Sequence, residues 1–347
     1  MKQIYVLTTI LLLTCINLIA QTTDVVTGLS IPQGMVLNGN DLYIAEVTGS
    51  KISKIDITDA TPTAIDVVTG LNKPRQLLLN GNDLYIAEEG GNKISKIDIT
   101  DATPIAIDVV TDLSNPQGMV LNGNDLYIAE STGSKISKID ITDAIPTAID
   151  VVTDLSNPRQ LVLSGNDLYI AELTGNKISK IDITDTTPTT TDVVTANFPN
   201  FIMLAGNEIY IAEEGASKIS KFDITDTTPT TTDIVTNLGI PAGIALKDNT
   251  LYISLILQNK IVSTQITLSL NENLFTEKIR MFPNPSSDFI QFSGLTKKVN
   301  YKIFNTQGSI IQNGTTSNQE EIDIRSLTNG LYFLKFDSGN TLKFLKE

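Results

Sequence analysis

The chain has 347 residues, 41% of them hydrophobic and 18% charged, so it has enough apolar residues for a folded core. It contains no histidine and no tryptophan, and its single cysteine, Cys15, lies near the N-terminus. A mature chain that begins after Cys15 has no thiol and no imidazole. This excludes disulfides, zinc sites built on those ligands, and catalytic Ser-His pairs.

The negative charge is concentrated in one part of the chain. Residues 21–274 contain 15 lysines and arginines against 32 aspartates and glutamates, whereas residues 275–347 contain 9 against 7. An acidic surface argues against nucleic acid and against an anionic membrane surface as partners. It is compatible with cations, sugars and basic proteins, and also with a soluble surface that has no partner.

The first 20 residues predict a secretory signal peptide. Lys2 precedes an apolar run over residues 4–20, and Ala20 offers a small residue for cleavage before Gln21. The run is too short and interrupted to favour a membrane anchor, which needs about 20 apolar residues. A lipoprotein signal at Cys15 is the other alternative, although Thr14 replaces the usual small residue before it. We expect no membrane span in the mature chain.

Six tandem units follow the leader. The segment NGNDLYIAE at residues 80–88 recurs nearly unchanged at 38–46, 122–130 and 164–172, with degraded copies at 205–213 and 247–255. Each copy belongs to a unit that opens with Asp-Val-Val-Thr or Asp-Ile-Val-Thr. The units open at Asp24, Asp66, Asp108, Asp150, Asp192 and Asp233, which are 42 residues apart except for the last pair, at 41. Repeats of this length are typical of propellers and solenoids.

One unit, residues 66–107 with the start of the next, predicts four short strands at 77–79, 84–88, 93–100 and 105–111. Asn80-Gly81-Asn82 predicts a type I′ hairpin turn, because Asn-Gly readily adopts positive φ angles. The segment DATP at residues 101–104 predicts a connection, because proline cannot continue a strand ladder and aspartate bonds its own backbone.

Four antiparallel strands in each of six units predict an all-β fold, a six-bladed β-propeller with four-stranded blades. The first unit opens with a fourth-strand sequence, 24–27, that lacks its three partners, and the sixth unit stops after its third strand, 261–268. We therefore expect the N-terminal strand to close the last blade, which leaves no orphan edge. A linear β-solenoid is the alternative, but it does not explain the split unit.

The repeats resemble the NHL family of propellers over residues 23–268. The matching segments in the first unit are Pro32-Gln33-Gly34, Gly39-Asn40, Leu42-Tyr43-Ile44-Ala45-Glu46 and Lys51-Ile52. Glu46 stands where the family has aspartate. The resemblance implies the fold but leaves the function open, since such propellers serve as binding platforms, lyases and lactonases. A virginiamycin-lyase-like activity would need a histidine, and the unlike Glu, Asn and Asp ligands of gluconolactonase-like pores are not evident.

From residue 279 the pattern changes to short alternating strands, which predict a small β-sandwich. The motifs are Pro283-Asn284-Pro285, NTQG at 305–308, Gly330-Leu331-Tyr332 and KFLK at 343–346. This stretch resembles the type A C-terminal sorting domain of the type IX (Por) secretion system. The resemblance implies contact of residues 279–347 with that machinery, export by way of the periplasm, and removal of the domain on export. An ordinary adhesive or carbohydrate-binding sandwich is the alternative.

These patterns divide the chain into four parts. Residues 1–20 form the signal peptide, 21–270 the propeller, 271–278 a linker, and 279–347 the sorting domain. The linker is polar and lacks alternation, so we expect it to be exposed to proteases. The mature protein is expected to be a monomer that is secreted or held at the cell surface.

Loops after the second and fourth strands of a blade share one face, and the six units differ most at these places. Because repeat proteins usually carry function in such loops, we predict that this face binds a glycan, peptide or protein. Drift between copies is the alternative. The candidate residues are Gln33, Arg75, Gln76, Gln117, Arg159, Gln160, Asn200, Phe201, Glu89 and Glu214.

Arg75 and Arg159 are the only arginines in the predicted propeller, and they lie on alternate units. A guanidinium at the pore mouth can grip a carboxylate or sulfate in bidentate fashion. The alternative is that each arginine pairs with a neighbouring glutamate.

One glutamate ends the second strand in five units, namely Glu46, Glu88, Glu130, Glu172 and Glu213. A ring of carboxylates is a weak candidate for calcium, which takes six to eight oxygen ligands. Symmetry-related strand ends are too far apart to share one ion, and a consensus glutamate usually bonds backbone or the following lysine. No catalytic residue and no other cofactor are predicted. We expect a non-catalytic binding platform, with a metal-dependent lactonase or hydrolase that uses pore carboxylates as the alternative.

Overall fold

The computed structural model describes residues 21–266, 280–293, 295, 298–305, 309–336 and 341–347. The predicted signal peptide and the predicted linker 271–278 lie outside the described residues. The described chain contains strands and loops and no helix, so nothing in it is a helix that could span a membrane. It divides into two compact units, with the boundary between residues 267 and 268.

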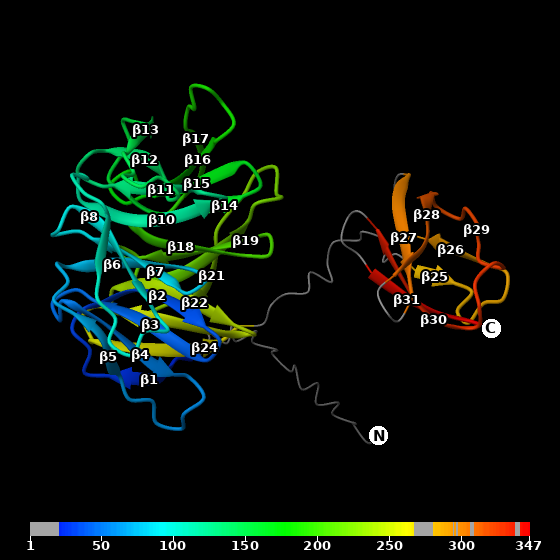
Figure 1. Cartoon of the computed structure of the whole chain (residues 1–347), viewed down its shortest axis with the longest axis horizontal. Helices are drawn as coiled ribbons and strands as arrows, with labels where there is room; N and C mark the ends of the chain where they lie inside the picture. The colour runs from blue at the N-terminus through cyan, green and yellow to red at the C-terminus, as the bar shows by residue number, and fades with distance from the viewer. Residues whose placement is uncertain (1–20, 267–279, 294, 296–297, 306–308, 337–340) are drawn as a thin grey trace, which may run out of the picture. The chain divides into compact units, whose positions relative to one another are not determined.

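The N-terminal unit contains six four-stranded antiparallel sheets, five of them built from consecutive strands (Figure 1). Sheet 1 contains β2 (Pro32–Asn38), β3 (Asp41–Glu46), β4 (Lys51–Asp56) and β5 (Ile65–Thr69). Sheet 2 contains β6 (Pro74–Asn80), β7 (Asp83–Glu88), β8 (Lys93–Asp98) and β9 (Ile107–Val110). Sheet 3 contains β10 (Pro116–Asn122), β11 (Asp125–Glu130), β12 (Lys135–Asp140) and β13 (Ile149–Val152). Sheet 4 contains β14 (Pro158–Ser164), β15 (Asp167–Glu172), β16 (Lys177–Asp182) and β17 (Thr191–Thr195). Sheet 5 contains β18 (Pro199–Ala205), β19 (Glu208–Glu213), β20 (Lys218–Asp223) and β21 (Thr232–Val235).

Sheet 6 combines the two ends of this unit. It contains β22 (Pro241–Lys247), β23 (Thr250–Leu255), β24 (Lys260–Gln265) and the N-terminal β1 (Thr23–Thr27). β1 pairs antiparallel with β24, with Thr23 opposite Ser263 and Thr27 opposite Lys260. The buried Val26 and Leu29 belong to a core cluster that also holds residues of sheets 1 and 6. The predicted pairing of the N-terminal strand with the last sheet is confirmed.

The hairpin turns differ from the prediction. β6 ends at Asn80 and β7 begins at Asp83, so the two-residue loop is Gly81-Asn82. Gly81 has a φ of +61°, whereas Asn82 does not have a positive φ. A positive φ at the first central residue alone fits a type II′ turn, so the predicted type I′ turn is wrong. The Asn80 that suggested it belongs to the strand.

An aspartate closes the third strand of each of the first five sheets. In sheet 2, Oδ1 of Asp98 accepts hydrogen bonds from the Thr100 backbone N–H at 2.8 Å and from its hydroxyl at 2.6 Å. These bonds lower the pKa of Asp98 below its ordinary value. The turn therefore starts before the predicted DATP segment. The fourth strand starts only at Ile107, so the third and fourth strands are shorter than predicted.

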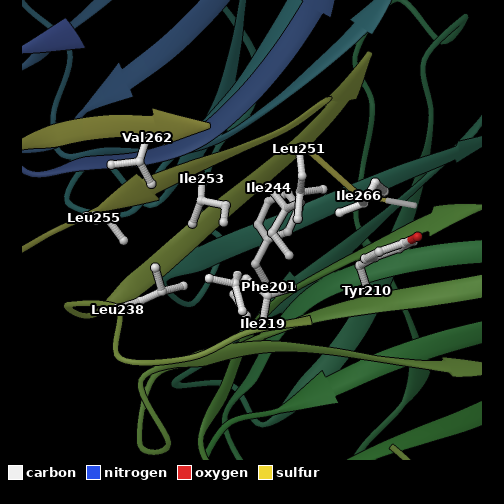
Figure 2. Packing of buried hydrophobic residues seen from close by; sticks show 12 residues of the cluster. Phe201, Tyr210, Ile219, Leu238, Ile244, Leu251, Ile253, Leu255, Val262 and Ile266 are labelled. Carbon is white, nitrogen blue, oxygen red and sulfur yellow. The ribbon is translucent and has the colours of Figure 1, made fainter. Parts of the chain in front are cut away.

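The hydrophobic core lies between neighbouring sheets. Figure 2 shows one cluster, in which Phe201 and Tyr210 of sheet 5 pack with Ile244 and Leu251 of sheet 6. A second strand contributes to two such clusters, since its side chains alternate between faces. Leu84 and Ile86 of β7, for example, pack with sheet 1, whereas Tyr85 and Ala87 pack with sheet 3. This explains why the four central residues of β7, Leu84 to Ala87, are all apolar.

The first strands of neighbouring sheets approach one another most closely at glycines. A Cβ atom on Gly118 of β10 would lie 2.7 Å from Cα of Gln160 in β14, and closer still to the carbonyl oxygen of Arg159. Gly34 of β2 has the same relation to Gln76 of β6. Some first strands therefore differ in sequence because of packing, since a glycine on one strand makes room for a glutamine on the next.

We expect Gly118→Ala to lower the free energy of unfolding by about 1–3 kcal/mol, because the added methyl group meets backbone atoms that have no room to move. Gly133→Ala in the same sheet is the matched control, since its Cβ would meet only side-chain atoms, at 3.0–3.4 Å. Urea unfolding with a shared m-value measures both. Equal midpoints for the two variants would contradict the close packing of β10 against β14.

The C-terminal unit contains two sheets. One has β25 (Arg280–Phe282), β26 (Phe289–Ser293) and β29 (Ile322–Asp323). The other has β27 (Val299–Phe304), β28 (Ile310–Thr316), β30 (Gly330–Phe336) and β31 (Thr341–Lys346), in the order β28-β27-β30-β31. Phe292 of the first sheet meets Phe336 of the second edge to face, with ring centroids 5.1 Å apart. The two sheets share one hydrophobic core.

Candidate functional site

The residues predicted for the ligand-binding face lie together at the centre of the N-terminal unit. A central cavity is lined by Gln33, Gly34, Arg75, Gln76, Gln117, Arg159, Gln160, Asn200, Phe201 and Ala242. Eight of these are predicted residues, and the other two predicted residues, Glu89 and Glu214, hydrogen-bond to Arg75 and Asn200. We call the ten predicted residues the pore mouth.

The cavity itself is very small. Its volume is about 20 Å³, close to the 10–15 Å³ that one water molecule needs by this measure. Pockets that enclose a small-molecule ligand are typically about 300–1,000 Å³. A ligand larger than water therefore has to lie over the pore mouth, with no more than one small group entering it.

A chain of hydrogen bonds crosses the pore mouth from sheet 2 to sheet 4. Nε of Arg75 donates to Glu89, and the Asn115 amide donates to the other oxygen of Glu89 at 3.4 Å. Gln117 donates to Asn115, and Nη1 of Arg159 donates to Oε1 of Gln117 at 2.7 Å. The chain links the two arginines through one carboxylate and two neutral amides.

The two arginines differ in their partners. Burial alone would raise the pKa of Glu89, but the hydrogen bond and charge of Arg75 outweigh it and hold that pKa below its ordinary value. Among the described residues Arg159 makes no ion pair, and its buried Nε has no partner. Burial, and next the charge of Arg75, lower the pKa of Arg159. The alternative of a neighbouring glutamate partner is confirmed for Arg75 and wrong for Arg159.

Most of the other pore-mouth side chains are buried and form its walls. Gln33, Gln76, Gln117 and Gln160 are only 6–8% exposed. Phe201 is 7% exposed and belongs to the core between sheets 5 and 6 (Figure 2). The partly exposed residues of the pore mouth are Arg75, Glu89, Arg159, Asn200 and Glu214. These five are the ones open to a ligand.

A second set of residues, just before the first strands, was not among the predicted ones. The residue before the proline of each of the first five first strands has a positive φ, from 49° to 62°. These residues are Ile31, Lys73, Asn115, Asn157 and Phe198. Phe198 is 42% exposed. These residues differ between units, and that variation could have marked them as candidates. A residue before proline is expected to be extended, so their left-handed backbone conformation could not be predicted.

The glutamates that end the second strands hold the chain entering their own sheet. In sheet 2, Glu88 accepts hydrogen bonds from the backbone N–H of Asn72 at 2.7 Å and from the hydroxyl of Ser95 at 2.6 Å. Nζ of Lys93 lies 3.6 Å from Oε1 of Glu88. The backbone bond recurs at Glu46, Glu130, Glu172 and Glu213. The interpretation of these residues as bonded to backbone and lysine is confirmed.

These glutamates do not fit a shared calcium site. Calcium takes six to eight oxygen ligands, whereas here each of the first five sheets offers one buried carboxylate, which already accepts a backbone N–H. Within the described part of the chain, no three Asp, Glu, His or Cys residues are grouped so as to hold a metal ion.

Sheet 6 shows what replaces this glutamate. Leu255 and Val262 stand where sheet 2 has Glu88 and Ser95, and both are buried. We expect Glu88→Leu to lower the free energy of unfolding by about 1–3 kcal/mol, because it leaves the buried Ser95 hydroxyl without its acceptor. The double variant Glu88→Leu/Ser95→Val should recover part of this loss. Urea unfolding of both single variants and the double variant measures the coupling, and purely additive losses would contradict it.

A wider hollow of about 670 Å³ lies elsewhere, between β1 and residues 57–64 of sheet 1. Three of its four charged residues, Asp24, Glu46 and Lys51, are paired, and the fourth, Asp59, lies in an exposed turn. Lys51 lies 2.5 Å from Asp66 and 3.5 Å from Glu46, and Asp24 lies 2.6 Å from Lys260. The hollow is the junction of the first and last sheets and includes none of the pore mouth.

Comparison with known proteins assigns the C-terminal unit. Residues 280–347 match the family described as the secretion system C-terminal sorting domain. No curated protein matches the chain in sequence.

Solved structures show the fold of the N-terminal unit. A catalytically inactive histidine-to-alanine variant of virginiamycin B lyase from Staphylococcus aureus, with quinupristin, is 19% identical with a TM-score of 0.54, over 72% of this chain and 99% of that one. A gluconolactonase from Xanthomonas campestris is 12% identical with a TM-score of 0.60, over 72% and 90%. A nidogen/laminin complex gives 15% identity and a TM-score of 0.51, over 58% and 80%.

These likenesses agree with the repeated four-stranded antiparallel sheets of a propeller. At such identities they show the fold alone. The chain carries a β-propeller followed by a C-terminal sorting domain, which sends it through the type IX secretion system to the cell surface or the extracellular space.

Proposed function

We propose that the protein is an exported, non-catalytic binding platform whose pore mouth binds a glycan, peptide or protein. In this proposal the six sheets are the blades of a closed six-bladed ring, and the two C-terminal sheets form a β-sandwich. The first strands support the ring, since glycines of one sheet pack against the next and Gly243 of sheet 6 packs against Gln33 of sheet 1.

The observation that carries the proposal is a very small cavity beneath a polar face. The cavity of about 20 Å³ has no room for a substrate, whereas Arg159 lines it with a buried donor that has no partner. Buried donors without partners are uncommon and costly in folded proteins. A partner that lies over the face and supplies an acceptor would remove that cost.

The chemistry of the chain also favours binding over catalysis. One similar lyase is inactivated by a histidine-to-alanine change, and this chain has no histidine. Another similar structure comes from a complex of nidogen with laminin. A metal-dependent lactonase would need a set of oxygen ligands at the pore, and the pore mouth offers amides, arginines and glutamates with protein partners.

We propose that the chain is divided as the sequence predicts. Residues 1–20 are a signal peptide, 21–270 the propeller, 271–278 a linker and 279–347 the sorting domain. We further propose that the mature protein acts as a monomer. Each unit has its own hydrophobic core, which supports the division into separate domains.

The test is a binding screen of the chain from Gln21 to Glu347 against glycan, peptide and extracellular protein panels, with a lactone hydrolysis assay with and without calcium. We expect a binder whose affinity falls at least tenfold with Arg159→Ala, since buried arginines often dominate an interface. Asn82→Ala, in the exposed turn at the opposite end of sheet 2, is the control. Calcium-dependent turnover of a lactone would overturn the proposal.

A further inference from the structure

The sheets allow an internal comparison at the pore mouth. In sheet 2, Arg75 of the first strand pairs with Glu89, which lies 14 residues later. In sheet 5, Asn200 bonds to Glu214 across the same separation. Sheet 4 has an arginine in the position of Arg75, but the residue that follows its second strand is Leu173.

Arg159 is therefore a second copy of Arg75 without its carboxylate. Its Nη1 donates to the neutral amide of Gln117, and its buried Nε has no partner. Among the described residues no carboxylate lies within ion-pair distance of it. Burial and the charge of Arg75 disfavour the charged guanidinium and lower its pKa, so a carboxylate at this place would relieve an unfavourable environment.

Resting on the proposed function, we infer that the sheet 4 side of the pore mouth binds a carboxylate side chain of a partner protein. Arg159 takes that carboxylate as Arg75 takes the carboxylate of Glu89. The small volume of the cavity admits a single carboxylate group and keeps the rest of the partner above the face.

The surroundings favour a protein over an acidic polysaccharide. In sheet 2 the acceptor reaches the arginine on a glutamate stem, whereas the residue at that position in sheet 4, Leu173, is buried and brings no acceptor. Phe198 is 42% exposed, and its backbone N–H bonds to Asn176 of the turn that follows β15, 3.0 Å away. Arginine and aromatic residues are both enriched in protein interfaces.

Charge points the same way. The region 21–274 carries 32 acidic against 15 basic residues, so it repels a polymer with a carboxylate on every unit. A single glutamate on a neutral or basic protein surface avoids that repulsion. The class of partner is thus a protein that presents an isolated acidic side chain next to apolar residues.

The arginine Nε–H signals in proton–nitrogen NMR test this directly, because the chain has few arginines. The probe is a blocked pentapeptide, acetyl-Gly-Lys-Glu-Phe-Gly-amide, added to the chain from Gln21 to Glu347. There are two comparison probes. One is the same peptide with glutamine in place of its glutamate, and the other is trigalacturonate. We expect the glutamate peptide alone to shift the Arg159 signal, while Arg75, paired with Glu89, and Arg325, paired with Asp323, stay unmoved.

Two variants exchange the residues that follow the second strands of sheets 2 and 4. Leu173→Glu supplies the carboxylate from within, so the Arg159 signal should move toward that of Arg75 without peptide, and peptide affinity should fall at least tenfold. Glu89→Leu should make Arg75 respond to the peptide as a second site. Thr174→Glu adds the same charge one residue further on, at an exposed position, and should change affinity less than threefold.

Several results would overturn the inference. An Arg159 signal that the glutamate peptide leaves unmoved removes the carboxylate site, and a response to trigalacturonate in place of the peptide removes the protein partner. If the binding screen finds a ligand whose affinity is indifferent to Leu173→Glu, the platform stands and this inference falls. If the screen finds no ligand and the glutamate peptide leaves the Arg159 signal unmoved, the proposed function and this inference both fall.

Discussion

Deleting residues 21–29 is expected to lower the free energy of unfolding by about 4 kcal/mol or more, because two buried apolar side chains are lost at roughly 2–5 kcal/mol each. These are Val26, 7% exposed, and Leu29, 5% exposed. The deletion also removes the strand paired with β24 and leaves that strand as an open edge. Against a total stability of about 5–15 kcal/mol for a typical domain, this loss is large.

Urea unfolding of the chain that begins at Ser30, compared with the chain that begins at Gln21, measures the loss. Asp24→Asn is the control, because it removes only the ion pair with Lys260 from a side chain that is 56% exposed, and such pairs contribute about 0–1 kcal/mol. A synthetic peptide of residues 21–30 should restore stability by adding its strand back to β24. Equal unfolding midpoints for the two chains would show that β1 contributes nothing to closure.

The repeats made much of the fold predictable from one sequence. A unit copied six times shows its own strands and turns, because strand residues recur and turn residues keep Gly and Asp at fixed places. The split unit identified the N-terminal strand as the partner of the last sheet. Local geometry was less predictable, since Asn80 could belong to the turn or to the strand and only the register decides.

The grouping of the candidate residues around one cavity was predictable, whereas their contacts were not. Comparing units located the pore mouth, but the same comparison mixed two causes of variation. Gln76 and Gln160 vary with Gly34 and Gly118 because the first strands pack there. The contrast between Arg75 and Arg159 needed the knowledge that the residue 14 positions later bonds to Arg75 in sheet 2 and to Asn200 in sheet 5.

Deleting residues 280–347 is expected to abolish export, because this stretch is the sorting domain for the type IX system. The propeller has its own cores and its own closing strand, so the truncated chain should still fold. We expect it to accumulate in the periplasm, with less than about a tenth of the wild-type amount at the surface or in the medium. Immunoblots of the three fractions, with a type IX-deficient strain beside them, measure this. Gly118→Ala, a destabilised chain with an intact sorting domain, is the control that separates folding from export.

The exported wild-type protein should also be shorter than the gene product. We expect it to begin at or near Gln21 and to end within about residues 271–278, because the predicted linker is polar and exposed linkers are where proteases cut. Intact-mass measurement and sequencing of both ends, on protein collected from cells and medium, decide this. Fusing residues 271–347 to an unrelated periplasmic reporter should export the reporter and leave the fused segment cut at the same place. Exported protein that still ends at Glu347 would refute the cleavage, and a reporter that stays in the periplasm would show that the propeller itself takes part in export.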